Sequence, residues 1–233
     1  MKVFIVHAHH EPRSFNGALT NVAQRVLTSE GHEVRISDLY AMKFDPVSDR
    51  RNFTSIKNPD YLKQQVEEMH ASEVNGFAPD IQGEIEKVRW CDLMIWQFPL
   101  WWFSVPAILK GWVDRVFAMG RAYGQGLAYE KGVFRGKRAV LSITTGGAGE
   151  AFLEKCDPER EFHEGHGFHG DIYGILRPIQ RGILRFTGFD VLRPHIIYGP
   201  VRLTDEERRQ CLDAYATRLR GIAEEVPIDV GLY

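Results

Sequence analysis

Short apolar segments alternate with amphipathic ones along this chain, and that alternation constrains the fold more than any other feature. The short segments are rich in β-branched residues, which is typical of buried strands, and the longer ones repeat their apolar residues at helical spacing. We predict strands at 2–8, 33–39, 92–98, 137–144 and 190–198, and helices at 16–30, 80–90, 106–117, 171–186 and 204–225. Strands separated by helices form a parallel sheet covered on both faces, so we expect a doubly wound, five-stranded α/β fold.

Two stretches lack this alternation. Residues 40–79 are long and polar with few periodic apolar residues, and residues 152–168 are rich in Glu, His and Gly. Loops of this length are usually functional or mobile. We therefore expect both stretches to be irregular loops.

A single domain is the simplest organisation for a chain of 233 residues without internal repeats or linker-like tracts. We expect this domain to cover residues 1–233 and to end in a helical extension at about 200–233. The pair Thr204 and Glu207 has the spacing of a capping box, which predicts where the helix of the extension begins.

Composition limits the class of protein. The chain has 29 Lys and Arg residues against 31 Asp and Glu residues, so a net charge of −2 leaves no basic excess for binding nucleic acid. Its three cysteines, Cys91, Cys156 and Cys211, are too far apart for a disulfide framework or a CxxC metal knuckle. No apolar run reaches the ~18 residues of a membrane span. We therefore expect a cytoplasmic protein with no nucleic-acid partner and no stable membrane insertion.

Three segments follow the carboxyl ends of predicted strands, where open parallel sheets bind their ligands. The first, residues 7–16, leads into a helix whose free N-terminal amides form an anion site. Ser14 and Asn16 add hydroxyl and amide groups, and His9 and Arg13 add charge when protonated. This set suits a phosphate or diphosphate group. The alternative is that Ser14 or Asn16 is only a helix N-cap.

The second segment is aromatic and the third is rich in glycine. Residues 99–103 hold two tryptophans and a phenylalanine in a row, which suits a flat aromatic ligand. The alternative is a hydrophobic plug or a dimer contact. Residues 144–149 include Gly146 and Gly147, whose amides can closely approach a carbonyl oxygen or a developing anion, although a tight turn has the same composition.

Two further motifs point to chemistry that their context does not support. Residues 165–170 match G-x-G-x-x-G, but they follow a polar loop rather than a strand, so we do not expect a dinucleotide to bind there. His163, His166 and His169, with Cys156 nearby, suggest a metal site. Their spacing is not a standard ligand pattern, so we predict no metal.

Several longer motifs carry a family resemblance, and the run from Pro106 to Trp112, PAILKGW, is the most specific. The others are residues 8–9 with 14–16, 37–42, 97–117, 131–132, 139–149, and 169–171 leading through 178–180 to 188–189. With these motifs the chain resembles the flavin-dependent NAD(P)H quinone reductases of the DT-diaphorase type, which have a flavodoxin-like fold. The match weakens beyond Gly188 but continues through the last predicted helix.

The resemblance implies a non-covalent flavin, FAD rather than FMN, and NAD(P)H as co-substrate. The implied cofactor-binding residues are His9, Ser14, Phe15, Asn16, Pro99, Leu100, Trp101, Trp102, Phe103, Asp114, Thr144, Thr145, Gly146, Gly147 and Arg208. Asp114 and Arg208 fall where the family contacts the adenosine half of the cofactor, so Arg208 favours FAD. The implied substrate-binding residues are Trp102, Phe103, Tyr123, Phe152 and Phe186.

The implied reaction is a ping-pong transfer of two electrons from NAD(P)H through the flavin to a quinone or a related acceptor. His169 matches the catalytic histidine of the family, where an imidazole stabilises negative charge or relays a proton. Its alternative role is that of a loop or capping residue for the helix that follows. The family shares each site between two subunits, so we expect a homodimer in which Tyr123 reaches the substrate pocket of the partner.

The chain also departs from the family pattern. Phe152 stands where the family has a catalytic tyrosine, Trp101 replaces a glutamine of the mammalian enzymes, and Arg181 and Arg185 replace two metal-binding histidines of one branch. An alternative function is that of a flavin-binding ancillary subunit of a potassium-efflux transporter. A simple electron-shuttling flavodoxin is disfavoured, because such shuttles are strongly acidic.

Overall fold

A computed structural model describes residues 1–152 and 169–231, and it confirms the predicted doubly wound architecture. The strands are β1 (Lys2–His7), β2 (Glu33–Asp38), β3 (Leu93–Pro99), β4 (Arg138–Thr145), β5 (Asp190–Val191) and β6 (His195–Tyr198). The helices are α1 (Phe15–Ser29), α2 (Gln64–Val74), α3 (Pro79–Trp90), α4 (Ala107–Val116), α5 (Ile172–Ile179) and α6 (Asp205–Arg220). None of the helices in these two ranges is long and apolar enough to cross a membrane.

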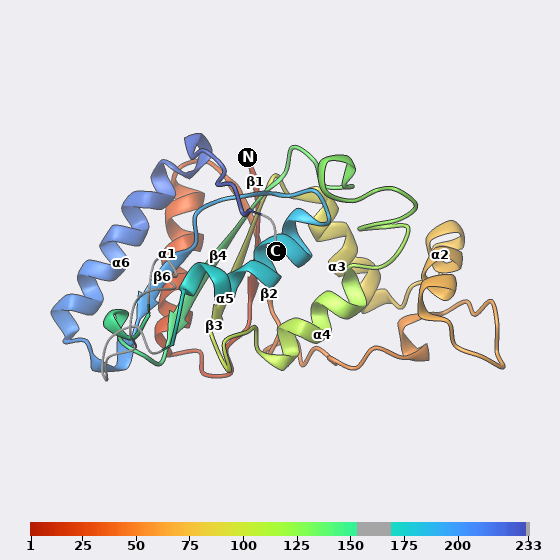
Figure 1. Cartoon of the computed structure of the whole chain (residues 1–233), viewed down its shortest axis with the longest axis horizontal. Coiled ribbons are helices and arrows are strands. Elements are labelled where there is room, and N and C mark those ends of the chain that lie inside the picture. The colour runs from red at the N-terminus through yellow and green to blue at the C-terminus, as the bar shows by residue number, and fades with distance from the viewer. Residues whose placement is uncertain (153–168, 232–233) are drawn as a thin grey trace.

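The sheet separates two layers of helices (Figure 1). Alternate residues of β1 enter different cores: Phe4 packs with the cluster under α3, α4 and α5, and Ile5 packs with the cluster under α1 and α6. Both faces of the strand are therefore buried, which explains its continuous apolar run. On the second face, Leu19 of α1 and Leu219 of α6 are both fully buried in the same cluster.

All neighbouring strands run parallel, in the order β2-β1-β3-β4-β5. The chain reverses its direction of travel across the sheet between β1 and β3, which makes their carboxyl ends the topological switch point. His7 of β1 lies in register with Gln97 of β3, and the amide of Leu100 donates to the carbonyl of Thr144 at 2.8 Å. The segments that follow β1, β3 and β4 therefore emerge side by side.

The prediction that residues 40–79 are irregular is wrong in part, because α2 lies within them. The buried face of α2 consists of Glu67, Glu68 and Ala71, so two of its three buried positions are carboxylates. The Glu67 carboxylate accepts hydrogen bonds from the amides of Lys57 and Asn58, at 2.7 and 2.9 Å. A helix that packs through acidic side chains has no apolar periodicity to reveal it.

The predicted fifth strand, residues 190–198, is divided into β5 and β6, which both pair with β4. Pro194 lies in the interruption, and proline has no amide hydrogen to donate to a sheet. The amide of Leu192 still donates to the carbonyl of Ala139 at 2.8 Å. The two short strands therefore pair with β4 one after the other, on the same edge.

The two predicted helices near the carboxyl end are confirmed, with one change of winding. After Ile179 the helix α5 widens into a π-helical stretch, Gln180–Arg185. Pro178 precedes this stretch, and Pro within a helix removes one α-helical hydrogen bond. At the start of α6, Thr204 and Glu207 form the predicted capping box.

Candidate functional site

A cleft of about 680 Å³ opens at the carboxyl ends of β1, β3 and β4. This volume is in the usual range for small-molecule sites. All three predicted segments contribute to its wall. The predicted cofactor residues that line it are His9, Ser14, Phe15, Asn16, Pro99, Leu100, Trp101, Trp102, Thr144, Thr145, Gly146 and Arg208.

The Asn16 side chain joins the three segments beneath the cleft. Its amide nitrogen donates to the Thr144 hydroxyl at 2.9 Å, and its amide oxygen accepts from the Gln97 side chain at 2.8 Å. All three residues are buried, so these hydrogen bonds are protected from water. Because its side chain is engaged in this way, Asn16 offers a ligand its backbone amide rather than its side chain.

Ser14 is the N-cap of α1, and its hydroxyl accepts a hydrogen bond from the amide of Gly17 at 3.1 Å. Ser14 is therefore an N-cap, as the alternative reading has it, and it also lines the cleft. The amides of Phe15 and Asn16 belong to the first helical turn, where no intrahelical acceptor exists. Together with the helix dipole, these amides make the end of α1 suitable for an anion.

His9 lines the cleft as a neutral hydrogen-bonding group. Burial and the neighbouring His10 lower the pKa of His9. Its Nδ1 lies 3.0 Å from the Glu11 amide nitrogen and 3.3 Å from the Glu11 carbonyl oxygen, and the shorter contact favours the neutral tautomer with the proton on Nε2. His9 also stacks on His10 with ring centroids 4.7 Å apart. The predicted positive charge of His9 is therefore not favoured, and Nε2 is its donor.

The aromatic segment after β3 forms a tight turn with unusual backbone angles. Trp102 and Phe103 have φ angles of 51° and 56°, and the amide of Ser104 donates to the carbonyl of Trp101 at 3.0 Å. Bulky residues rarely adopt positive φ, and each such residue costs about 1–3 kcal/mol. The turn leaves Trp102 95% exposed. Strain of this kind is concentrated at functional sites, which supports a binding role for the turn.

His169 lies next to this turn but does not line the cleft. Its ring packs between Phe103 and Phe152, at centroid distances of 5.4 and 5.0 Å. A Cβ added to Gly147 would lie 3.1 Å from the His169 ring, so any larger residue there would have to push the ring aside. The structure therefore brings four predicted residues, Phe103, Gly147, Phe152 and His169, into one group beside the cleft.

The far end of the cleft is formed by α6 and the turn before it. Arg208 donates through Nε to the carbonyl of Pro200 at 2.9 Å and pairs with Asp205 at 2.7 Å. Pro200 and Val201 line the cleft beside it. Sequence reasoning missed these two residues, because it considered the segments after the first, third and fourth strands but not the one after the fifth.

Three predicted residues, Asp114, Tyr123 and Phe186, line a second cavity rather than the cleft. This cavity measures about 550 Å³ and lies between α2, α4 and the π-helical stretch. The Tyr123 and Phe186 rings lie 6.0 Å apart, and Asp114 forms an ion pair with Lys110 at 2.6 Å. Within one chain, these residues are not brought together with the cofactor residues of the cleft.

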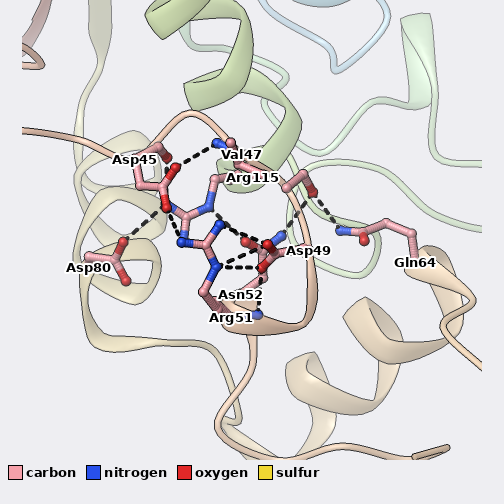
Figure 2. Close-up of polar contacts among 9 residues, drawn as sticks. Asp45, Val47, Asp49, Arg51, Asn52, Gln64, Asp80 and Arg115 are labelled. Carbon is pink, nitrogen blue, oxygen red and sulfur yellow. Dashed lines mark hydrogen bonds and ion pairs between the residues drawn. The ribbon is translucent and has the colours of Figure 1, made fainter. Parts of the chain in front are cut away.

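The wall of the second cavity depends on a buried arginine (Figure 2). Arg115 of α4 donates to the Asn52 side chain and to the carbonyl of Asp45, both at 2.7 Å, and pairs with Asp80 at 3.3 Å. These contacts hold residues 45–52 against α4. Ser48, which lines the cavity, belongs to this segment.

The metal motif lies mostly outside the described residues, which exclude His163, His166 and Cys156. Among residues 1–152 and 169–231, no group of three His, Cys, Asp or Glu side chains could hold a metal ion. The G-x-G-x-x-G match also falls outside them, apart from His169 and Gly170. Arg185, one of the two arginines at the family's metal positions, pairs with Asp190 at 3.1 Å.

The donor set of the cleft fits a flavin. A flavin nucleotide needs an apolar slot for its rings, donors at the ring edge and an anion site for its phosphate. Trp101 and Leu100 supply apolar surface, and the end of α1 supplies the anion site. A Cβ at Gly146 would meet no atom within 4 Å, so the backbone there faces open space that a ring edge could fill.

Comparisons with known proteins agree with this geometry. A family model described as a flavodoxin-like fold matches residues 1–219. The human ribosyldihydronicotinamide dehydrogenase [quinone] is 44% identical over 97% of this chain and 94% of its own length. The guinea pig (Cavia porcellus) NAD(P)H dehydrogenase [quinone] 1 is 43% identical over 97% of this chain and 79% of its own.

A solved structure agrees with these relatives. A Klebsiella pneumoniae protein, described as a proposed quinone reductase, superposes with a TM-score of 0.89 at 39% identity. The superposition covers 98% of this chain and 87% of the other. Matches of this extent reach from β1 through α6. The chain therefore belongs to the flavodoxin-like family of NAD(P)H quinone reductases.

Proposed function

We propose that this protein is an FAD-dependent NAD(P)H:quinone oxidoreductase that works as a homodimer. The observation that carries the proposal is the cleft, in which the segments after β1, β3 and β4 meet an aromatic turn and the start of α6. Family membership supports a flavin cofactor and a quinone-like acceptor. The choice of FAD, the dimer and the roles of individual residues are our inferences.

The end of the cleft formed by α6 favours FAD over FMN. There Pro200, Val201 and Arg208 add to a wall that otherwise comes from the segments after β1, β3 and β4. FMN ends at its phosphate, whereas FAD continues with a second phosphate and an adenosine. Arg208 comes from α6, and a guanidinium plane offers stacking and hydrogen bonds to an adenine. We assign this end to the adenosine half of FAD.

The side chains of the cleft bind and orient the cofactor. Bound FAD supplies the hydride-transfer chemistry. The amides of Phe15 and Asn16 and the Nε2 proton of His9 would bind the diphosphate. Pro99, Leu100, Trp101, Trp102 and Phe103 would line the ring system, and Thr144, Thr145, Gly146 and Gly147 would bind its polar edge.

His169 would act at the polar edge of the ring system. Its ring lies against Gly147, whose amide is part of the proposed ring-edge site. From there an imidazole can stabilise negative charge or hold a proton. Phe152 packs on His169 but has no hydroxyl with which to exchange that proton.

The homodimer is supported by two surfaces that a single chain leaves open. Trp102 is 95% exposed although it belongs to the cleft, and an aromatic surface of this size favours burial. The second cavity holds Asp114, Tyr123 and Phe186. We infer that each subunit covers the aromatic turn of its partner with this cavity. Light scattering should give a dimer, and a monomer with full turnover would refute the shared site.

Anaerobic stopped-flow absorbance tests the reaction. The purified protein should be yellow, lose its flavin absorbance on mixing with NADH or NADPH, and recover it on mixing with a quinone. Recovery at a rate that matches steady-state turnover supports the ping-pong order. A yellow protein that neither nicotinamide bleaches would contradict the enzyme. A flavin that is bound but not reduced by either nicotinamide is what the transporter-subunit alternative predicts. No observation favours that alternative.

Arg208→Ala tests the assignment of the adenosine half. The variant should lose affinity for FAD and keep its affinity for FMN, both measured by flavin fluorescence titration. The matched control is Arg209→Ala, one position further along α6, whose ion pair with Glu206 lies on the exposed side. Equal losses for FAD and FMN would mean that α6 does not contact the adenosine.

His169→Ala tests the role of the imidazole. Flavin should remain bound, whereas reduction by NADH or reoxidation by quinone should slow. The two half-reactions are measured separately by stopped flow. Wild-type rates in both would remove His169 from the mechanism.

A further inference from the structure

Glu68 is a carboxylic acid buried at the wall of the second cavity. Glu68 is only 4% exposed, and it lies on α2, where it lines the cavity together with Tyr123. No salt bridge joins it to a cation in the described part of the chain. Buried acids without a cationic partner are rare because ionisation away from water is costly. The burial of Glu68 is therefore not explained by an ion pair.

The partners of Glu68 connect it to the hydroxyl of Tyr123. Its two oxygens accept from the amide of Met119 at 2.7 Å and from the Gln64 side chain at 2.9 Å. The Tyr123 hydroxyl lies near enough to the Glu68 carboxylate for each to act on the other: the phenol lowers the pKa of Glu68, and the carboxylate raises the pKa of Tyr123. The Tyr123 oxygen accepts in addition from the Gln65 side chain at 3.2 Å. Carboxyl and phenol are thus neighbours, and both groups line the cavity.

The electrostatic surroundings favour the protonated form of both groups. Burial raises the pKa of Glu68. Burial raises the pKa of Tyr123 as well, and the neighbouring Glu68 raises it further. Toward the ionised carboxylate the phenol is the donor. Once Glu68 is protonated, its own hydrogen can be donated to the phenol oxygen instead, which leaves the phenol hydrogen free to point into the cavity.

Other titratable groups near Glu68 are engaged elsewhere. On α2, Glu67 binds the amides of Lys57 and Asn58, and His70 bonds to the Ser55 hydroxyl at 2.9 Å. On α4, Asp114 lines the same cavity, but it is paired with Lys110. Among the described residues, Glu68 is thus the carboxyl of this cavity that can exchange a proton with Tyr123.

Docking of the turn that carries Tyr123 does not depend on Glu68 alone. Ser72 of α2 donates to the carbonyl of Met119 at 3.0 Å, and Arg121 donates to the carbonyl of Ser72 at 3.1 Å. Gly120, with a φ of 84°, packs directly on Ser72. These contacts make it possible to separate a docking role from a proton role by mutation.

We propose that Glu68 supplies protons to Tyr123, and that the Tyr123 hydroxyl protonates the carbonyl oxygen of the quinone-like acceptor in the partner's cleft. This inference rests on the proposed function and its dimer. Reduction of a quinone to a hydroquinone consumes one hydride, which originates on NAD(P)H, and one further proton. The Tyr123 O–H bond breaks as the acceptor O–H bond forms, and the Glu68 proton replaces the one that Tyr123 loses. The Glu68 carboxylate then takes a proton from water.

A titration that does not depend on turnover tests the pair first. The chain has eight tyrosines, so 3-fluorotyrosine is incorporated and the ¹⁹F signal of Tyr123 is assigned by its loss in Tyr123→Phe. Glu68→Gln keeps the shape of the side chain but removes its charge and its acidic proton. The pKa of Tyr123 should fall in Glu68→Gln. The matched control is Ser72→Ala, which removes a different hydrogen bond between α2 and the turn and should leave that pKa unchanged.

The half-reactions then test the proton transfer. Glu68→Gln should slow reoxidation by quinone about 10-fold and leave reduction by NADH unchanged, since general acids contribute at least this much. Tyr123→Phe should slow the same step, and the double variant should be no slower than the slower single variant. In the wild type the reoxidation rate should fall as pH rises through the raised pKa of Glu68, and Glu68→Gln should remove that dependence.

Three outcomes overturn the inference. The first is a Tyr123 titration unchanged by Glu68→Gln, the second is an equal shift in Ser72→Ala, and the third is reoxidation at wild-type rate in Glu68→Gln. Each leaves the proposed function intact, because the flavin still binds and NADH still bleaches it. Failure of the proposed function is recognised separately, by a wild-type protein that no nicotinamide reduces.

Discussion

The cleft and the second cavity are built in different ways. The cleft lies at the ends of regular, fully buried strands, and its polar framework is the short series Gln97, Asn16 and Thr144. The second cavity lies between helices, and the irregular segments that complete its wall are held in place by buried polar side chains, above all Arg115 and Glu68. The first is positioned by apolar packing, and the second by hydrogen bonds from side chains to loop backbone.

This difference predicts how each region responds to mutation. Apolar packing spreads stabilisation over many contacts, so the cleft should tolerate the loss of a distant side chain. A loop held by one buried charge should be lost when that charge is removed, because its partners are left buried and unpaired. The second cavity should therefore be the more fragile of the two.

The largest effect is expected from Arg115→Met. Removing the buried guanidinium leaves Asn52 and the Asp45 carbonyl without their donor, and should lower the free energy of unfolding by about 4 kcal/mol. Urea denaturation measures this loss. The matched control is Arg51→Met, in the same network of Figure 2 but exposed, which should change stability little. Equal losses in the two variants would contradict the difference between the regions.

The next prediction concerns the layer of α1 and α6 beside the cleft, where His195 is one of several residues with a buried polar atom that has no hydrogen-bond partner in the described part of the chain. His195 Nε2 is buried without a hydrogen bond in the described residues, and burial lowers the pKa of His195 to about 4. The unfolded chain binds a proton from about pH 6.5 downward, so stability should be full above that pH and fall by about 3 kcal/mol by pH 4. In His195→Phe the free energy of unfolding should no longer show this part of its decrease between pH 6.5 and pH 4. Urea denaturation across the pH range measures it. An unchanged pH dependence would contradict the burial of a neutral imidazole.

Two glycines offer a matched pair, one for each region. A Cβ on Gly17 would lie 2.1 Å from the Pro12 carbonyl oxygen beside the cleft, and one on Gly111 would lie 2.2 Å from the Pro46 carbonyl oxygen beside the second cavity. Each Gly→Ala change should cost about 2 kcal/mol. Gly17→Ala should weaken FAD binding, whereas Gly111→Ala should shift the ¹⁹F signal of Tyr123 and leave FAD affinity unchanged. The reverse pattern would show that the regions are not independent.

The smallest effect concerns the far end of the cleft. Thr204→Ala removes the N-cap of α6 and should lower the free energy of unfolding by about 1 kcal/mol. Because α6 carries Arg208, FAD affinity should fall slightly and FMN affinity should not. Thr217→Ala, later in the same helix, removes only a hydroxyl bonded to the Asp213 carbonyl and is the control. A larger loss of FMN than of FAD affinity would contradict the assignment of this end.

The cleft was predictable because it follows from strand patterning. A run such as that of β1 is apolar on both faces, and parallel strands end at one edge, so the residues after β1, β3 and β4 had to meet. The division of β5 from β6 depends on Pro194 alone. One proline does not change the apolar pattern of the residues around it, so the pattern predicts one continuous strand. Pro200 and Val201 follow that divided strand, and they were missed with it.

The second cavity was not predictable by the same reasoning. The Arg115 side chain reaches Asn52 and Asp45 across 63 and 70 positions of the chain. The buried face of α2 presents Glu67 and Glu68, which sequence patterning assigns to solvent. Hydrogen bonds between such distant polar residues leave no local periodicity, and only the folded structure identifies them.

The central claim is that the cleft at the sheet edge holds one FAD. The most direct measurement is to denature the purified protein and identify the released cofactor by mass and absorbance, with its amount counted per chain. The account predicts one FAD per chain. A colourless protein that takes up no added flavin would contradict the site itself, and FMN as the sole cofactor would contradict the role of α6.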